Sequence, residues 1–159
     1  MNGFLGKRGS RLVAALAVAL PLPAVAADSA WHFNFQQGIA EYAVGSFAEG
    51  GSNLALYCTE AGVRPGSVSV TLHRAGFTPA AGTAATFTTE RGRVTLFVDR
   101  EGSVAYPSLA VAPRFRALWQ LLATSRTLRV SYGPGRPMVF PLRGAGALLG
   151  RTVCPRQLG

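Results

Sequence analysis

The sequence has few of the residues from which metal and catalytic sites are usually built. It contains two histidines, two cysteines and seven acidic residues, compared with 16 basic residues. The histidines, His32 and His73, stand about 40 residues apart, and no acidic cluster accompanies either. Because a zinc or iron site needs several such ligands together, we expect no metal. The sequence also lacks an apolar run of the roughly 20 residues that a membrane-spanning helix requires.

Motifs for catalysis and cofactor binding are equally scarce. No Gly-x-Ser-x-Gly sequence surrounds a candidate nucleophile, and neither histidine lies in a motif that would mark it as a base. The glycine-rich segment Gly144–Gly150 suggests a dinucleotide loop, but no acidic residue follows it to bind the ribose. The alternative is a turn that leads into a short C-terminal helix. We therefore predict no cofactor and no catalytic residue.

The first 27 residues have the composition of a secretory signal peptide. Three basic residues precede the nine-residue apolar run Leu12–Leu20, and the small residues Ala24-Val25-Ala26-Ala27 follow it. No cysteine stands at the expected cleavage point to carry a lipid. We predict that residues 1–27 are removed and that residues 28–159 form one β-rich domain, which works in the periplasm or outside the cell. Export also argues against nucleic acid as a partner.

Alternation of apolar and polar residues dominates the rest of the chain. A period of two is typical of strands with one buried face, and Gly- and Pro-rich turns separate the runs. The runs lie at residues 31–35, 42–47, 54–58, 67–72, 93–99, 103–106, 127–132 and 138–142. They predict a mainly β protein with an antiparallel, sandwich-like sheet. The turn at residues 100–102 predicts a hairpin between its two flanking runs, and residues 77–86 are expected to form a loop.

One segment, at about residues 113–124, has the period of a helix. Phe115, Leu118, Trp119 and Leu122 recur at i, i+3, i+4 and i+7, which places them on one face. Pro113 is acceptable in a first helical turn. The aromatic face could line a ligand groove, but packing of an amphipathic helix against the sheet explains it more simply. A short helix is expected near the C-terminus.

The charge of the predicted domain is basic and comes from arginine alone. Cleavage would remove three of the 16 basic residues and none of the acidic ones, which leaves a formal charge of about +6. Several arginines surround the predicted helix and the strand after it, where they could form a patch for an anionic ligand or partner. The alternative is scattered, solubilising charge. The candidate residues are Arg114, Arg116, Arg126, Arg129 and Arg136.

The two cysteines, Cys58 and Cys154, both lie in the part of the chain that is predicted to be exported. An even pair in an oxidising compartment indicates one disulfide, here closing a loop of nearly a hundred residues. A redox or metal site is the alternative, but the sequence contains no Cys-x-x-Cys pair.

A family resemblance adds to these observations. It is carried by a tryptophan soon after the signal peptide, two cysteines and several apolar segments: Trp31, Leu54-Ala55-Leu56-Tyr57-Cys58, Val94–Asp99, Leu128-Arg129-Val130, Phe140-Pro141-Leu142-Arg143-Gly144 and Cys154. The sequence resembles the invasion-associated locus B family and the accessory periplasmic proteins of type VI secretion clusters. This resemblance implies a disulfide-linked, non-enzymatic binding or accessory protein of the bacterial envelope, with a role in secretion as one possibility. A small periplasmic hydrolase acting on cell-wall or polar substrates is the alternative.

Overall fold

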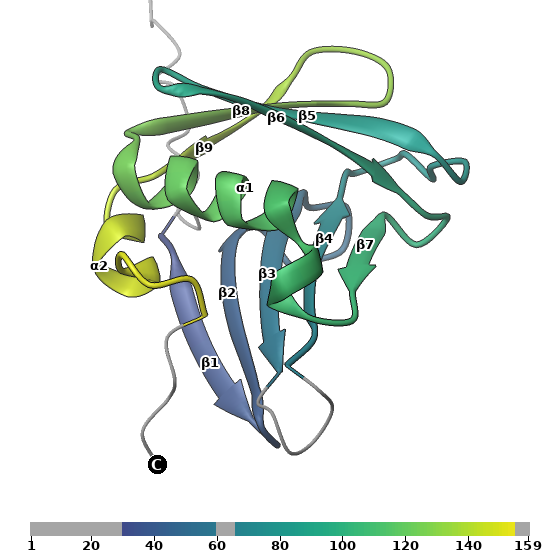
Figure 1. Ribbon diagram of the computed structural model, residues 1–159. Coiled ribbons are helices and arrows are strands. Elements are labelled where there is room, and N and C mark those ends of the chain that lie inside the picture. Colours follow the sequence, from purple (N-terminus) through teal and green to yellow (C-terminus); the bar gives the residue numbers. More distant parts are fainter. Residues whose placement is uncertain (1–29, 60–65, 155–159) are drawn as a thin grey trace, which may run out of the picture.

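The computed structural model of the protein describes residues 30–59 and 66–154. The predicted signal peptide, residues 1–27, lies outside the described residues. Figure 1 shows two sheets whose strands cross, with two helices on one side. The elements are β1 (His32–Gln36), β2 (Ile39–Gly45), β3 (Asn53–Thr59), β4 (Val68–His73), β5 (Thr83–Thr89), β6 (Gly92–Val98), β7 (Ser103–Tyr106), the 3-10 helix η1 (Leu109–Val111), α1 (Pro113–Thr124), β8 (Thr127–Tyr132), β9 (Met138–Pro141) and α2 (Ala145–Leu149).

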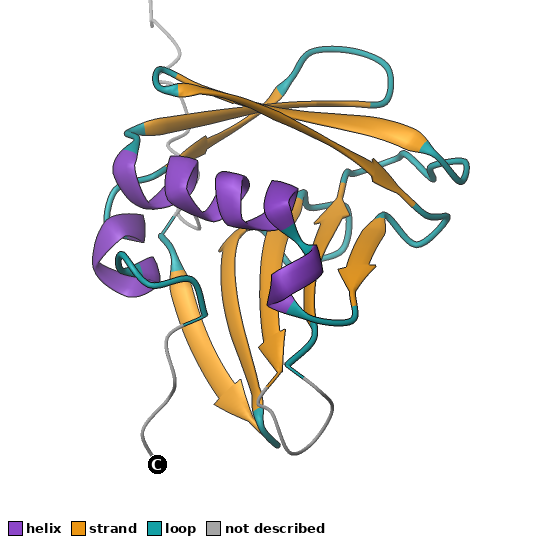
Figure 2. Ribbon diagram, in the orientation of Figure 1, coloured by secondary structure: helices purple, strands orange, loops and turns teal. Residues whose placement is uncertain are grey.

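The strands form two antiparallel sheets, so the predicted mainly β, sandwich-like fold is confirmed. One sheet has five strands in the order β1-β2-β3-β4-β7, and the other has four in the order β6-β5-β8-β9. α1 runs along the four-stranded sheet, where it contacts β6 and β5, and α2 lies next to α1 (Figure 2). The predicted helix at residues 113–124 and the short C-terminal helix correspond to α1 and α2.

Residues of both sheets and of α1 share one core. In β8 the alternation is complete, since Leu128, Val130 and Tyr132 are buried while the residues between them are exposed. α1 buries the four apolar residues that its period predicts. Trp119 of α1 is fully buried and meets Tyr42 of β2 edge to face, with 5.0 Å between ring centroids. Each large apolar side chain buried here contributes roughly 1.5–3 kcal/mol, so the helix belongs to the core and its aromatic face is not a groove.

The expected loop at residues 77–86 is wrong from Thr83 onward, because β5 begins there. β5 is a central strand, paired with β6 on one side and β8 on the other. Its buried residues are Ala85, Phe87 and Thr89, and two of these three are too small or too polar to give a clear strand signal. Pairing on both edges, which a local pattern does not report, makes this segment a strand.

The predicted hairpin at residues 100–102 is also wrong, although the turn exists. Asp99 Oδ1 accepts hydrogen bonds from the backbone N–H of Ser103 at 2.8 Å and of Glu101 at 3.0 Å. The strand that follows leaves the sheet of β6 and pairs with β4 of the other sheet. The backbone N–H of Leu72 in β4 donates to the Gly102 carbonyl at 2.9 Å, so the chain is already hydrogen-bonded to β4 within the turn.

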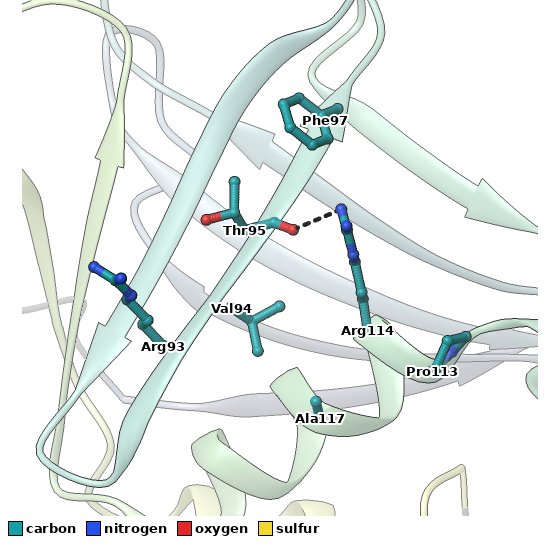
Figure 3. Close-up of a pocket in the computed structure, with 7 residues that line it drawn as sticks. All are labelled: Arg93, Val94, Thr95, Phe97, Pro113, Arg114 and Ala117. Carbon is teal, nitrogen blue, oxygen red and sulfur yellow. Dashed lines mark hydrogen bonds between the residues drawn. The ribbon is translucent and has the colours of Figure 1, made fainter.

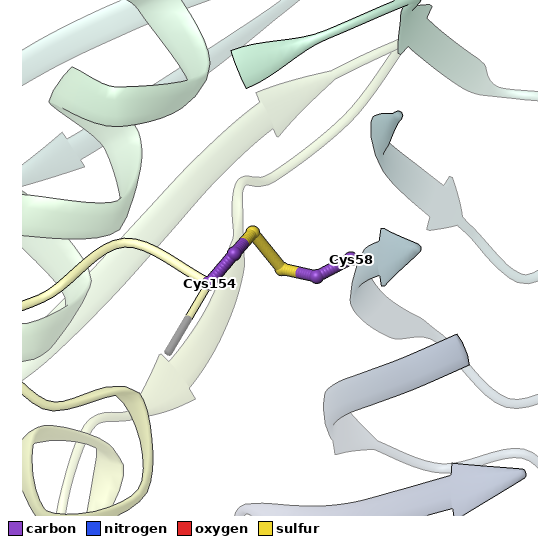
Figure 4. The surroundings of a disulfide bond; sticks show 2 residues. All are labelled: Cys58 and Cys154. Atoms are coloured by element: carbon purple, nitrogen blue, oxygen red, sulfur yellow. A yellow bond between two sulfur atoms is a disulfide. The ribbon is translucent and has the colours of Figure 1, made fainter. Parts of the chain in front are cut away.

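The predicted disulfide is present and joins the end of β3 to the segment after α2. Cys58 and Cys154 lie with their Cα atoms 5.7 Å apart and are bonded to each other (Figure 4). A stable disulfide of this kind is typical of proteins outside the reducing cytoplasm. Within the described ranges, no helix is both long and apolar enough to cross a membrane.

The glycine-rich segment forms α2 and its two ends. Gly144, with φ of +85°, precedes the helix, and Gly150, with φ of +63°, follows it. A side chain at Gly146 would press on the Ala123 carbonyl of α1, since its Cβ would lie 2.6 Å from that oxygen. Gly144 and Gly150 therefore form the turns at the two ends of α2, and Gly146 allows α1 and α2 to pack closely. This agrees with the prediction of a turn that leads into a short C-terminal helix.

Candidate functional site

One hollow of the described surface lies between α1 and the strand β6. Burial of one face of α1 leaves the opposite face, with Arg114 and Ala117, directed toward β6 (Figure 3). β6 is an edge strand of the four-stranded sheet, with β5 on its other side. An edge strand beside an exposed helix face creates a groove with backbone on one wall and side chains on the other.

The groove consists of two adjoining pockets, with volumes of about 590 and 1040 Å³. Arg93, Val94 and Ala117 line both, so the two hollows are continuous along β6 and α1. The first also contains Thr95, Phe97, Pro113 and Arg114; the second also contains Arg91, Gly92, Gln120, Leu121, Ala123, Thr124, Gly146, Gly150 and Arg151. We call this feature the basic groove.

Arg114 closes one end of the basic groove against β6. Its Nη1 donates to the Thr95 carbonyl at 3.3 Å, and its guanidinium carbon lies 5.8 Å from the centre of the Phe97 ring. The hydrogen bond is longer than the usual 2.7–3.2 Å for an N–H donor. Phe97 is unusually exposed for an aromatic residue, with 56% of its surface accessible. Arg114 thus rests on an aromatic ring and a strand edge, with its remaining donors available.

The charge lining the basic groove has one sign. Arg91, Arg93, Arg114 and Arg151 line it, and none of the acidic residues within 30–59 and 66–154 does. Glu90 is the acidic residue next to Arg91 in the sequence. Its Oε1 accepts a hydrogen bond from the backbone N–H of Arg126 at 2.6 Å. Hydrogen bonds from its own backbone amide and from that of Arg126 lower its pKa, so it is already engaged as an anion. Because arginine binds carboxylates and phosphates through two parallel hydrogen bonds, the basic groove suits an anionic group.

Comparison with known proteins identifies a family for the fold that carries this groove. The model of the YfjT family matches residues 29–149, which is more than half of the chain and includes both sheets and both helices. The chain belongs to the YfjT family. No curated protein and no solved structure is significantly similar to this YfjT-family chain. The resemblance to the invasion-associated locus B and type VI accessory proteins stays a prediction.

The five arginines predicted to form a patch occupy different places in this YfjT-family fold. All five are exposed, but only Arg114 lines the basic groove. Arg116 lies on α1, and Arg126 follows the far end of that helix, which is about 18 Å long at 1.5 Å per residue. Arg129 lies on the solvent side of β8, and Arg136 lies in the loop before β9. Their role in binding an anion stays a prediction.

Three arginines of the basic groove were not among the sequence candidates. Arg91 and Arg93 flank the first residue of β6, and Arg151 follows α2. Their only sequence signal is the Arg-Gly-Arg start of a strand, which does not reveal that the strand is an edge or that a helix runs beside it. Tertiary structure brings Arg93 into the same pocket as Arg114, and Arg91 and Arg151 into the adjoining pocket.

The two histidines lie away from the basic groove. His32, on β1, packs edge to face on Phe47 with 5.2 Å between ring centroids, and His73 is exposed at the end of β4. Neither lines the groove. In the part of the chain that the structure describes, no three His, Cys, Asp or Glu residues gather as ligands for a metal ion.

Proposed function

We propose that this YfjT-family protein is a non-enzymatic binding protein of the bacterial envelope, and that it holds an anionic partner in the basic groove. The observation that carries this proposal is a continuous groove that, among the described residues, is lined by four arginines and no acid. Its lining contains guanidinium groups, apolar side chains that include Phe97, and the polar side chains of Thr95, Gln120 and Thr124, but no His, Asp or Glu of the described residues that could act as a base. These groups bind and orient a partner but do not include a nucleophile beside a base.

A location outside the cytoplasm is part of the proposal and has two supports. The disulfide between Cys58 and Cys154 favours an oxidising compartment. The composition of residues 1–27 favours export through a cleaved signal peptide. Fractionation of cells followed by N-terminal sequencing tests this part. We expect a periplasmic or secreted protein that begins at Asp28, and a cytoplasmic protein that retains Met1 would overturn it.

Binding of simple polyanions tests the anionic groove. Suitable probes are polyglutamate, heparin and vesicles of phosphatidylglycerol, each titrated at low and at moderate salt. We expect at least one probe to bind, and its affinity to fall with salt, because exposed charges are screened. The double variant Arg93→Gln, Arg114→Gln should weaken that binding at least about tenfold, since hydrogen bonds to charged groups contribute about 1.5–3 kcal/mol each.

Arg100→Gln together with Arg143→Gln is the matched control. It removes the same charge from two exposed positions outside the basic groove. If the groove is the binding site, this control should lose much less affinity than the groove variant. Equal losses would show that only net charge matters, and the proposed function would then be wrong.

A further inference from the structure

We propose that the partner held in the basic groove is an extended acidic segment of another protein, which adds to β6 as a fifth strand of the four-stranded sheet. This inference rests on the proposed function and specifies its ligand. Addition of a strand to an open sheet edge is a common mode of peptide recognition, in which backbone hydrogen bonds provide affinity and alternate side chains provide specificity.

The backbone of β6 offers a regular set of hydrogen-bonding groups along the groove. The Val98 carbonyl accepts from Gly82, on the side of β5, whereas the Thr95 carbonyl accepts from Arg114, on the opposite side. Successive residues of a strand alternate in this direction. The N–H and C=O groups of Arg93, Thr95 and Phe97 therefore point away from β5 and toward a position that another strand can occupy.

The other sheet edges are less suited to this role. β9 has four residues and is enclosed by Pro137 and Pro141, and β7 has four residues and is followed by Pro107. Short strands and prolines are the features that protect natural edges from pairing. β1 has five residues but no arginine, whereas β6 has seven residues and the arginine-lined groove.

Side chains on the two faces of β6 determine which sequence fits. Val94 points toward the core side, where the groove is lined by Ala117 and Leu121 of α1. Arg93 and Phe97 point to the exposed side. Side chains of an added strand alternate in the same way. Small apolar residues should face α1, and acidic residues should fall on the side of Arg93.

Arg114 links the two parts of this recognition. Its long hydrogen bond occupies the Thr95 carbonyl, which an incoming backbone N–H would use. When a strand arrives, that carbonyl can exchange the guanidinium for the peptide N–H. The guanidinium, still supported by the Phe97 ring, is then free to bind a carboxylate of the incoming segment.

The test uses three seven-residue peptides with blocked ends, matched in length to β6. The first alternates valine and glutamate, the second has glutamine in place of glutamate, and the third has the first sequence with alternate backbone nitrogens methylated. We expect only the first to bind well, with about tenfold or greater loss for each of the others, equivalent to about 1.4 kcal/mol. Methylation removes backbone donors and leaves the negative charge unchanged.

Hydrogen exchange locates the bound peptide on the protein. Addition of the first peptide should slow exchange of the amides of Arg93, Thr95 and Phe97, because each becomes engaged or covered. The amides of β1, at the edge of the other sheet, should be unchanged. Slower exchange at β1 without change at β6 would place the peptide elsewhere and overturn the inference.

A pair of substitutions at Thr95 separates backbone pairing from side-chain effects. Thr95→Pro removes the outward N–H, and Thr95→Val retains it; both lose the 3.0 Å hydrogen bond between the Thr95 and Thr86 hydroxyls. We expect Thr95→Pro to weaken binding of the first peptide about tenfold, and Thr95→Val to change it less than about twofold. Should the proline variant fail to fold, the methylated peptide makes the same test on the native protein.

The outcomes distinguish this inference from the proposed function. Strand addition is wrong if the methylated peptide binds as well as the unmodified one. It is also wrong if heparin or vesicles bind through the groove arginines and the peptides do not. In both cases the proposed anion-binding function of the groove is retained. If no anionic probe depends on the groove arginines, both proposals are wrong. Selective binding of the unmodified acidic peptide, with protection at β6, supports both.

Discussion

Reducing the disulfide between Cys58 and Cys154 removes a covalent link between residues that are 96 positions apart. In the chain-entropy model, closing a loop of this length lowers the entropy of the unfolded chain by about 16 cal/mol/K, which is about 4.7 kcal/mol at 25 °C. The loop includes every element from β4 to α2, so after reduction the noncovalent contacts alone must hold most of the domain in place. Natural domains are stable by about 5–15 kcal/mol, and we expect the reduced protein to be only marginally stable.

Urea unfolding of the oxidised and the reduced protein measures this effect. We expect a loss of about 4–5 kcal/mol on reduction. We also expect a steeper dependence on urea, because the unlinked unfolded chain exposes more surface. The double variant Cys58→Ala, Cys154→Ala should resemble the reduced protein and should not respond to reductant. A loss below about 1 kcal/mol would refute the entropic reasoning.

Three further predictions concern single residues. The Tyr132 hydroxyl is buried without a hydrogen-bond partner among the described residues, so Tyr132→Phe should stabilise the protein by about 1 kcal/mol in thermal or urea unfolding. Gly102 has φ of +76°, and a Cβ there would collide with the Leu72 carbonyl, so Gly102→Ala should cost about 2 kcal/mol or more in the same assays. Burial and the nearby Glu41 carboxylate raise the pKa of Tyr57 from 10.0 to about 12. Because the folded state favours the neutral phenol, its contribution to the free energy of unfolding is fully present below pH 10 and is lost as the pH rises from about 10 to about 12. Tyr57→Phe should remove this loss of stability between pH 10 and 12 from the unfolding profile.

Each of these predictions has an outcome that contradicts it. Destabilisation by Tyr132→Phe would indicate that the hydroxyl is hydrogen-bonded. A neutral Gly102→Ala would indicate that the turn tolerates a different backbone conformation. An ordinary titration of the Tyr57 phenol, followed by its absorbance, would show that the hydroxyl is neither buried nor affected by Glu41.

Features that depend on short-range periodicity were predictable from the sequence. α1 begins at Pro113 and ends at Thr124, and its buried residues are those at helical spacing, because one contiguous stripe meets one core. Strand β8 likewise follows its alternation. The disulfide was predictable because the chain has two cysteines and a signal-like N-terminus, and no other pairing exists.

Features that depend on pairing partners were not predictable in the same way. The Ala- and Thr-rich segment of β5 becomes a strand because β6 and β8 bind both its edges. The turn after Val98 is encoded by Asp99, but nothing local indicates that the next strand joins β4. Local sequence specifies conformation over a few residues, whereas sheet membership depends on segments far away in the chain.

The candidate site shows the same limit. Nearness in sequence predicted a patch shared by Arg114 and Arg126, but the length of α1 separates them. Arg93 and Arg114 are 21 positions apart in the sequence, yet both line the same pocket, because β6 is an edge strand and α1 runs along it. Arginines that are far apart in the sequence can therefore line one groove only because the strand and the helix that carry them lie side by side.

The route of the chain between the two sheets has a consequence for the order in which the protein can fold. Strands β5 and β6 belong to one sheet, β7 returns to the other, and β8 and β9 go back to the first. A chain emerging from its N-terminus therefore presents β5 and β6 to water well before β8, the strand that pairs with the remaining edge of β5, has appeared. Folding of this sheet must wait until residues near 141 are available, so the four-stranded sheet can form only after most of the chain has been synthesised.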